Sequence, residues 1–415
     1  MMTDYDVIVI GGGPAGLAAA NAVSKDLRVL LLERENRLGG ILKQCIHDGF
    51  GLVRFKEKLT GPEYASRFIN DLTDEIKVKT LAFVSRLEKR EEDYRLIYVD
   101  REGLHTPTTK NIILATGCRE RTRNQIFIPG NRGSGIYTAG TVQNLINLLG
   151  ICPCKKPLIL GSGDIGLIMA RRLKLEGADV VGVYEIKSEP TGLTRNIHQC
   201  LLDYQIPLYL SHTVTKIIGR DRVEAVEVSA VDSKMQVIPG TEKIVACDAL
   251  ILAVGLIPEN ELAEELRLRM DPGTKGPIVD QNMMTSESGV FACGNCLHVN
   301  DLVDYVSESA ETAGRAVAKE YQSRELLAVN IGSGLAYLLP QVLDLNENLN
   351  NLVFYFRSKE RLGTCRLILS IDEKDVWEKT YAQILPPEME RIKLNLDKYN
   401  LNKNNKIQFR IEVKG

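Results

Sequence analysis

The chain contains the same short pattern twice, and this repeat constrains its fold more than any other feature. Residues 6–35 and 157–186 each begin with an apolar run, turn through Gly-x-Gly-x-x-Gly, continue with helical periodicity and return as a second apolar run that ends in an acid. A strand, a glycine turn, a helix and a second strand in that order form the βαβ unit that binds dinucleotides. The repeat therefore predicts an α/β protein with two Rossmann-like dinucleotide-binding domains.

The glycines of each turn have separate roles in dinucleotide binding. Gly11 allows a tight turn off the first strand, and Gly13 has no side chain, so a pyrophosphate can approach the backbone. Gly16 lets the helix pack closely on the sheet, while the helix N-terminus directs free N–H groups at the phosphates. The second turn has the equivalent residues Gly161, Gly163 and Gly166.

An acidic residue closes each unit. Glu33 and Glu185 lie at the tips of the second predicted strands. A carboxylate at this place accepts hydrogen bonds from a ribose diol and repels a 2′-phosphate. The second site is therefore predicted to favour NAD(H) over NADP(H), with Lys187 two residues beyond the acid as an opposing influence.

Length, charge and cysteine content narrow the class of protein. A chain of 415 residues is long enough for about two or three domains, and a net charge of −2 offers no basic field for nucleic acid. We expect no signal peptide, because the N-terminal residues pass directly into a strand, and no transmembrane segment, because the apolar runs fall short of roughly 18 residues. Nine scattered cysteines are typical of reduced thiols, so the sequence predicts a cytoplasmic protein.

Three further segments stand in a fixed order with the two glycine turns. Residues 110–120 and 248–260 each end a predicted strand at a glycine, and residues 289–295 precede a long helical stretch. Over about residues 4–325, these five motifs together resemble the pyridine nucleotide–disulfide oxidoreductase superfamily. Its members are FAD- and NAD-binding flavoproteins with two dinucleotide-binding domains.

The resemblance implies a discontinuous FAD domain, residues 1–120 and 280–325, with an NAD domain, residues 121–279, inserted between its halves. A helix N-terminus near Glu308 and Ser309 would face the N1/O2 edge of the flavin, where it stabilises the negative charge of the reduced ring. The residues implied for FAD are Gly11, Gly13, Pro14, Ala15, Gly16, Glu33, Arg34, Gly40, Ala115, Thr116, Gly117, Gly294, Asn295, Glu308 and Ser309. The residues implied for NAD are Gly161, Gly163, Asp164, Ile165, Gly166, Glu185 and Gly255.

The chain departs from the disulfide reductases of this superfamily at their redox-active cysteines. Leu42 and His47 stand where one branch has its cysteine pair, with Cys45 between them. Residues 135–143, where the thioredoxin reductase branch has its pair, contain no cysteine. The glutamate that the family places two residues after the third glycine of the NAD turn is Ile168 here. We therefore expect an oxidoreductase that lacks the redox disulfide.

Four stretches resemble a narrower branch: GGILKQCIHDGFG, ATGCRERTR, LILGSGDIGLIMARRL and TGLTRNI. They are similar to the FAD/NAD subunits of multi-subunit amine and hydroxyacid dehydrogenases, among them sarcosine oxidase alpha, opine oxidase, hydrogen cyanide synthase and dye-linked proline dehydrogenase. Very similar proteins are partnered with a flavin-dependent glycerol-3-phosphate dehydrogenase-like subunit. The resemblance implies that a partner oxidises the substrate while this chain relays electrons, and that any peripheral association with a membrane is made through partners.

Several polar and thiol side chains near the predicted flavin site remain candidates for chemistry. His47 and Cys45 are the candidate catalytic residues, His47 for polar contact with flavin or substrate and Cys45 as a flavin-proximal thiol or a packing residue. Cys118 follows the first strand-end glycine. A basic cluster beyond it would meet a nucleotide phosphate or a docking partner, or form a solvated linker. This cluster consists of Arg119, Arg121 and Arg123.

Two cysteine pairs raise the question of a metal site. Cys293 and Cys296 have a C-x-x-C spacing, and Cys152 and Cys154 flank a proline. Four thiolates would suit zinc or an iron–sulfur cluster, but one pair falls on a connector and the other at the flavin phosphates, so we expect no metal. The stretch around Asn295 is interpreted instead as a flavin-binding loop, because Asn295 stands where the family has an aspartate.

The pattern changes after about residue 325. A linker rich in Asn, Gly and Leu is followed by alternating apolar runs separated by turn residues, which predicts a small all-β domain of about five strands over residues 330–415. No catalytic constellation falls in it. We interpret this domain as a docking module for partner subunits.

Three functions fit these observations. The leading prediction is an FAD-dependent, NAD(H)-linked oxidoreductase that relays electrons within a multi-subunit dehydrogenase. The first alternative is a free-standing NADH-dependent flavin reductase or oxidase that uses a single cysteine. The second is a nucleotide-binding assembly or regulatory subunit without a reaction of its own.

Overall fold

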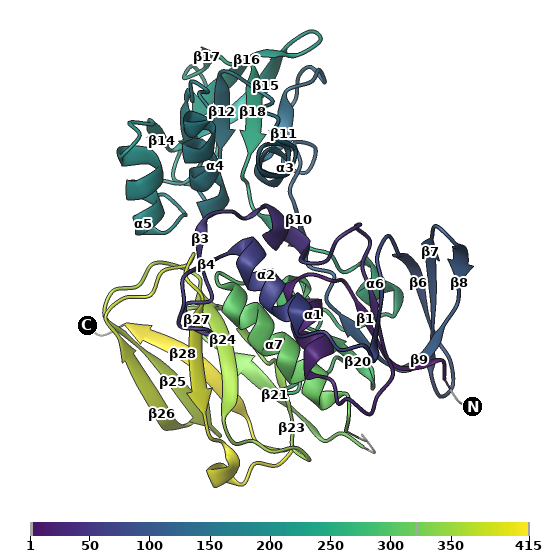
Figure 1. Ribbon diagram of the computed structural model, residues 1–415. Helices are drawn as coiled ribbons and strands as arrows, with labels where there is room; N and C mark the ends of the chain where they lie inside the picture. Colours follow the sequence, from purple (N-terminus) through teal and green to yellow (C-terminus); the bar gives the residue numbers. More distant parts are fainter. Residues whose placement is uncertain (1–2, 320–322, 414–415) are drawn as a thin grey trace. The chain divides into compact units, whose positions relative to one another are not determined.

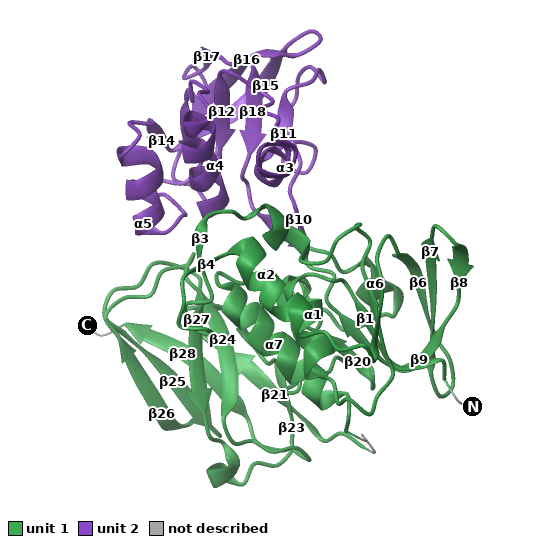
Figure 2. Ribbon diagram, in the orientation of Figure 1, with its two compact units in different colours: residues 1–118, 258–415 green, residues 119–257 purple. Residues whose placement is uncertain are grey.

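The computed structural model describes residues 3–319 and 323–413. The chain forms two compact units, shown in Figure 2: unit 1 contains residues 1–118 and 258–415, and unit 2 contains residues 119–257. The chain crosses between them in two short strands, β10 (Cys118–Glu120) and β19 (Leu256–Pro258).

Unit 1 is built on a mixed eight-stranded sheet with the order β5-β2-β1-β9-β7-β6. Its parallel half is a doubly wound arrangement, in which β20 also pairs with β9 and the helices α1 and α7 pack together (Figure 1). The strands β2 and β20 read as continuous apolar runs, because both of their faces are covered. The parallel half consists of β1 (Tyr5–Ile10), β2 (Val29–Leu32), β5 (Ile76–Lys79), β9 (Thr108–Leu114) and β20 (Val290–Ala292), with α1 (Pro14–Ala22) and α7 (Val303–Ala316).

The remaining elements of this domain extend the sheet and cover it. An antiparallel hairpin continues the sheet beyond β9, and α2 begins with a capping box in which Thr60 and Glu63 bind each other's backbone N–H. These elements are η1 (Gly40–Gln44), β3 (Asp48–Phe50), β4 (Leu59–Thr60), α2 (Gly61–Asn70), β6 (Phe83–Lys89), β7 (Tyr94–Asp100) and β8 (Gly103–His105).

Unit 2 repeats the doubly wound plan on a smaller scale. Its five-stranded sheet has the order β11-β18-β12-β13-β14 and is parallel throughout, and a three-stranded antiparallel sheet, β15-β16-β17, packs beside it. The elements are β11 (Ile136–Thr138), α3 (Ala139–Leu149), β12 (Pro157–Leu160), α4 (Asp164–Leu175), β13 (Gly182–Glu185), α5 (Thr194–Ile197), η2 (His198–Leu202), β14 (Leu208–Leu210), β15 (His212–Gly219), β16 (Val223–Ala230), β17 (Lys243–Ala246) and β18 (Ala249–Leu252).

The second boundary of unit 2 falls earlier than the sequence predicts. Residues 258–279 were assigned to the NAD domain by sequence, but they lie in unit 1. The reason is their apolar side chains: Ala263 in α6 (Glu261–Glu265), together with Leu266 and Leu268, belongs to the hydrophobic core of unit 1. The short helix η3 (Gly294–Cys296) then follows β20.

The C-terminal part of unit 1 is a β sandwich with a core of its own. A five-stranded sheet, β23-β21-β28-β25-β26, faces a three-stranded sheet, β22-β24-β27. The predicted number of about five strands was wrong, because the segment predicted as a linker contains buried leucines such as Leu335, Leu338 and Leu343 that form β22 and β23. The strands are β21 (Leu326–Ile331), β22 (Leu335–Leu339), β23 (Val342–Asp344), β24 (Leu352–Ser358), β25 (Cys365–Ile371), β26 (Lys374–Tyr381), β27 (Glu390–Leu394) and β28 (Ile407–Val413), with η4 (Asp397–Tyr399) before β28.

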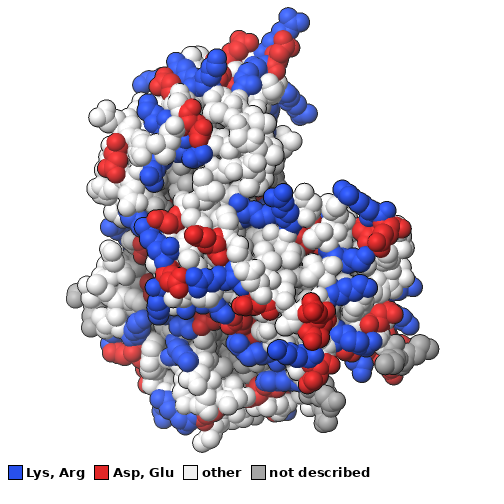
Figure 3. Space-filling model, viewed as in Figure 1, with Lys and Arg blue, Asp and Glu red and all other residues white. Residues whose placement is uncertain are grey.

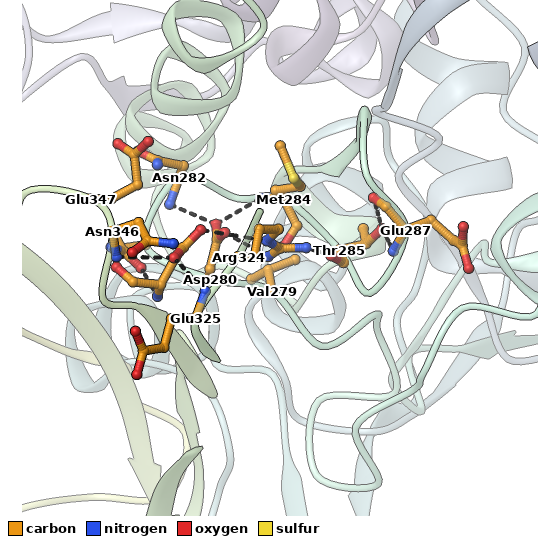
Figure 4. Close-up of polar contacts among 12 residues, drawn as sticks. Val279, Asp280, Asn282, Met284, Thr285, Glu287, Arg324, Glu325, Asn346 and Glu347 are labelled. Atoms are coloured by element: carbon orange, nitrogen blue, oxygen red, sulfur yellow. Dashed lines mark hydrogen bonds and ion pairs between the residues drawn. The ribbon is translucent and has the colours of Figure 1, made fainter. Parts of the chain in front are cut away.

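A buried ion cluster ties this sandwich to the dinucleotide-binding part of unit 1 (Figure 4). Arg324 Nη2 lies 2.6 Å from Asp280 Oδ2, and Arg324 Nε lies 3.6 Å from Asp344 Oδ2 in β23. Arg324 Nη1 also donates to the carbonyl of Thr285 at 2.6 Å. The Asp280 side chain is fully buried, and this burial raises its pKa although Arg324 opposes the effect.

Candidate functional site

The first glycine turn of unit 1 has no room for side chains at two of its glycines. Gly11 has a φ of +109°, and a Cβ there would lie 2.4 Å from the carbonyl oxygen of Ala115. A Cβ on Gly16 would lie 1.7 Å from the carbonyl oxygen of Gly11. Since real Cβ atoms do not approach oxygen so closely, both positions require glycine, as the turn motif predicts.

Gly13, the middle glycine of the Gly-x-Gly-x-x-Gly pattern, faces open space. A Cβ on Gly13 would meet nothing nearer than the Cα of Gly40, at 3.7 Å. Gly13 is the N-cap of α1 and no side chain caps that helix, so the N–H groups of its first turn are left for a ligand. Gly40 itself has a φ of +53° and packs against Gly13. This open, uncapped helix start fits a pyrophosphate.

Glu33 is buried and held at the end of β2 by two backbone donors. Gly12 N–H donates to Oε2 at 2.7 Å, and Glu35 N–H donates to Oε1 at 2.8 Å. Each carboxylate oxygen therefore keeps acceptor capacity for a diol. The neighbouring Arg34 forms an ion pair through Nη1 with Glu259 at 2.9 Å.

Three adjacent strand ends bring most of the predicted FAD residues together. The strands β1, β9 and β20 are neighbours in the sheet, and Gly11, Ala115 and Cys293 directly follow their ends. Ligands of doubly wound sheets bind at the carboxyl ends of the strands. The hydroxyl of Thr116 donates to the carbonyl of Glu259 at 2.6 Å, and a Cβ on Gly294 would lie 2.7 Å from the Cβ of Ala15 at the start of α1.

Asn295 organises the loop that follows β20. Its Oδ1 accepts from Asn300 N–H at 3.1 Å, and its Nδ2 lies 3.5 Å from Cys118 Sγ. The predicted flavin-binding loop is thus folded on itself through Asn295.

The replacement Asn295→Leu is expected to weaken FAD binding about tenfold, because a loop that loses these hydrogen bonds is less ordered. Fluorescence titration of the apoprotein with FAD measures the change. Cys293→Ala is the matched control: Cys293 is fully buried in the strand end, so this variant should bind FAD as the native chain does. Equal affinity in both variants would contradict the interpretation of the loop.

The prediction for Glu308 and Ser309 was wrong in its placement. The helix α7 begins at Val303, so both residues lie inside it rather than at its N-terminus. Glu308 binds Arg391 of β27 at 2.8 Å and also accepts a hydrogen bond from the hydroxyl of Tyr355. Helical periodicity predicts a stretch that begins at Asp304, one residue from the observed start, whereas the resemblance placed the N-terminus about five residues too late.

The turn of unit 2 repeats this geometry. Gly161 has a φ of +105°, and a Cβ there would lie 2.2 Å from the carbonyl oxygen of Ala253. A Cβ on Gly166 would lie 2.5 Å from the carbonyl oxygen of Gly161, whereas one on Gly163 would meet nothing within 3.9 Å. The helix start at Gly163 again has no side-chain cap and fits a second pyrophosphate.

The acid of the second site has more partners than the sequence predicts. Glu185 Oε2 accepts hydrogen bonds from Ser162 N–H at 2.9 Å, from the hydroxyl of Ser162 at 2.5 Å and from the hydroxyl of Thr191 at 3.4 Å. Lys187 N–H donates to Oε1 at 3.1 Å. The sequence did not predict Ser162 and Thr191 as partners of this acid. The signal for Ser162 was its hydroxyl side chain within the glycine turn.

The other predicted residues of this site lie around the same turn. Asp164 opens α4, and its Oδ1 accepts from Leu193 N–H at 2.9 Å and from Asn196 Nδ2 at 2.6 Å. Ile165 follows it in the helix. Gly255 has a φ of +99°, and a Cβ there would meet nothing within 4 Å.

Three of the candidate thiols, those of Cys45, Cys293 and Cys296, are buried. Burial raises the pKa of Cys45 to about 12, and it raises the pKa values of Cys293 and Cys296 as well. His47 is half-buried with its ring centroid 5.1 Å from that of Phe50. Within the described residues, the group of three or more potential metal ligands is Asp100, Glu102 and His105, which contains no cysteine.

The three arginines of the basic cluster in the connector differ in their surroundings. Arg119 and Arg121 are exposed, while Arg123 donates to the carbonyls of Asn131 at 2.6 Å and Gly130 at 3.2 Å. On the face seen in Figure 3, Lys and Arg side chains are interspersed with Asp and Glu. Arg123 therefore holds its own loop in place.

Among the residues that the structure describes, no helix is both long enough and apolar enough to cross a membrane.

Comparison with known proteins places this geometry in a family. The family model for pyridine nucleotide-disulphide oxidoreductases matches residues 5–319. The chain is 26% identical to an NADH oxidase of Methanocaldococcus jannaschii over 71% of this chain and 64% of that protein. It is 27% identical to the hydrogen cyanide synthase subunit HcnB of Pseudomonas protegens, over 75% of this chain and 69% of that protein. This chain thus spans less than two thirds of the NADH oxidase.

The fold also matches a solved structure. A thioredoxin reductase from T. acidophilum superimposes with a TM-score of 0.61 at 21% identity, covering 76% of this chain and 98% of that one. The family model ends at residue 319, before the strands of the C-terminal sandwich. The chain belongs to the pyridine nucleotide-disulphide oxidoreductase family and is an FAD- and NAD(P)-binding oxidoreductase.

Proposed function

We propose that unit 1 binds FAD, that unit 2 binds NAD(H), and that the chain relays electrons between them as one subunit of a larger dehydrogenase. The observation that carries the proposal is the pair of glycine turns, each with an open, uncapped helix start and a buried acid at the end of the next strand. When bound, FAD supplies hydride chemistry with a nicotinamide.

In this proposal the residues of the chain bind the two dinucleotides and orient them. The helix starts at Gly13 and Gly163 bind phosphates through backbone N–H groups, and Glu33 and Glu185 accept hydrogen bonds from ribose hydroxyls. Glu185 also favours NAD(H), because a carboxylate repels a 2′-phosphate. Cys45 takes no nucleophilic part in this proposal, since burial keeps its thiol protonated at neutral pH.

The subunit role rests on the relatives and on the missing redox cysteines. HcnB is named as a subunit of hydrogen cyanide synthase, and neither family position for a redox disulfide carries a cysteine pair here. Electrons that are not passed to a disulfide require another acceptor or donor, which supports a partner dehydrogenase subunit. We place the protein in the cytoplasm, because none of its nine cysteines, all within the described residues, forms a disulfide.

Anaerobic addition of NADH to the purified, FAD-loaded chain tests the proposal. The flavin absorbance band is expected to bleach with NADH and to bleach much more slowly with NADPH. The same experiment after thiol alkylation should give the same rate. A chain that binds ADP but shows no bleaching would support the regulatory interpretation, and a rate lost on alkylation would support the single-cysteine one.

A further inference from the structure

Two strands of the C-terminal sandwich direct polar side chains at the flavin domain. Successive side chains of a strand point to opposite faces. In β24, Phe354 and Phe356 lie in the sandwich core, so Tyr355 and Arg357 point the other way, and Tyr355 is part of the flavin domain's hydrophobic core. In β27, Ile392 lies in the sandwich core and Arg391 points away from it.

Arg357 binds the last residues of the predicted flavin-binding loop, residues 294–301. Its Nη2 donates to the carbonyl of Val299 at 3.3 Å and forms an ion pair with the carboxylate of Asp301. Asp301 Oδ2 also accepts from Met389 N–H at 2.6 Å, which comes from the sandwich as well. The sandwich thus holds residues 299–301 through both a guanidinium and a backbone donor.

Arg357 is itself fixed in one orientation. Its Nε donates to the hydroxyl of Tyr337 at 3.0 Å, and its Nη1 donates to the carbonyl of Pro386 at 3.3 Å. Its side chain is only 16% exposed. A planar guanidinium whose donors all have partners places its targets more accurately than a flexible ammonium would.

A short chain of contacts links Arg357 to the dinucleotide turn. Residues 299–301 include Asn300, whose N–H donates to Asn295 Oδ1 at 3.1 Å. Asn295 follows Gly294, which packs against Ala15 at the start of α1. A displacement of Asp301 is therefore passed along the loop to the phosphate-binding helix.

The loop also contains a buried histidine, His298. His298 is 1% exposed, and within the described residues neither of its ring nitrogens has a hydrogen-bond partner. Its ring lies 5.5 Å from that of Tyr355 and 5.9 Å from that of Tyr337. Burial lowers the pKa of His298 to about 3, and Arg357 adds to the effect. The imidazole is therefore uncharged at neutral pH and does not compete with Arg357 for Asp301.

A second bridge fixes the helix that follows the loop. Arg391 binds Glu308 of α7 at 2.8 Å and 2.5 Å, and Tyr355 donates to the same carboxylate. Burial alone would raise the pKa of Glu308, but these donors hold it below its ordinary value. The loop and the helix after it are thus both attached to the sandwich.

We infer that the C-terminal sandwich is part of the cofactor site, with Arg357 as a positioning residue that holds the loop Gly294–Asp301 in its FAD-binding conformation. The inference rests on the proposed function, because it takes unit 1 as the FAD unit. It gives the sandwich a role within this chain, in addition to the predicted docking of partner subunits.

The test compares full-length Arg357→Met with Arg357→Lys and with the control Arg366→Met. Arg366 is in the same sandwich, where it pairs with Glu378 and Glu412. FAD affinity of the apoprotein and the midpoint potential of the bound flavin are measured. Arg357→Met is expected to bind FAD about tenfold more weakly and to shift the potential. Arg357→Lys should recover part of the FAD affinity and part of the potential. Arg366→Met should change neither quantity.

Native affinity and potential in Arg357→Met would overturn the inference. If that variant does not fold, Asp301→Asn removes the charge of the ion pair while keeping an acceptor, and native values there overturn the inference equally. A native chain that binds no FAD would instead refute the proposed function, so the two failures are distinguishable.

Discussion

Gly16→Ala is expected to yield a protein without flavin, whereas Gly166→Ala is expected to keep its flavin and lose reduction by NADH. In each variant the new Cβ would overlap a carbonyl oxygen. The Cβ of residue 16 would lie 1.7 Å from the oxygen of Gly11, and the Cβ of residue 166 would lie 2.5 Å from the oxygen of Gly161. Relief of such overlap moves the helix away from the strand, at a cost of about 1–3 kcal/mol or more. The displaced helix N-terminus then no longer meets the pyrophosphate.

The flavin-to-protein absorbance ratio and an anaerobic NADH titration measure both outcomes. Gly363→Ala is the control, since a Cβ there meets nothing within 4 Å, and it should match the native chain in both measurements. Loss of flavin from Gly166→Ala together with its retention in Gly16→Ala would reverse the assignment of the two cofactors to the two units.

Arg324→Met is expected to destabilise unit 1 by about 3–5 kcal/mol, because it leaves buried carboxylates without their cation. Asp280 is fully buried and Asp344 is 2% exposed, so water cannot replace the guanidinium. Urea unfolding followed by the fluorescence of Trp377 measures the loss. The control Arg315→Met removes an exposed pair with Glu311 and should cost no more than about 1 kcal/mol.

The same variant is expected to become sensitive to pH. Burial already raises the pKa of Asp280, and Arg324 opposes that rise; without Arg324 the pKa rises further above its value in the unfolded chain. The folded state then holds a proton that the unfolded state has released, so stability is lost as the pH rises through the folded pKa. Arg324→Met should therefore lose more stability at about pH 8 than at about pH 5. An equal loss of stability at both pH values would contradict the assignment of the effect to Asp280.

The sequence predicted the parts of the site that depend on local spacing. Both glycine turns need only a few consecutive residues, and the structure places Gly11, Gly16, Gly161 and Gly166 where side chains do not fit. Periodicity placed the start of α7 within one residue, whereas the resemblance placed its N-terminus near Glu308, inside the helix. Local patterns of this kind are reliable where the chemistry requires one residue type and weak where several would serve.

What the sequence missed depends on contacts between distant residues. Thr191 N–H donates to the hydroxyl of Ser162, 29 residues earlier, because the loop after β13 meets the glycine turn. Arg357 lies far along the chain from the loop that it holds. The strands β22 and β23 were taken for a linker, since their pairing partners, β24 and β21, are separate segments. Strand pairing of this kind is set by tertiary packing more than by intrinsic preference.

The division of the chain into two units implies an order in which they fold during synthesis. Unit 2 is one continuous stretch, residues 119–257, and we expect it to fold while the ribosome is still adding the rest. Unit 1 begins first and finishes last, because β20, the loop at Gly294 and the strand that carries Arg357 all lie beyond that stretch. The nascent chain should therefore become able to bind a nicotinamide before it is able to retain a flavin.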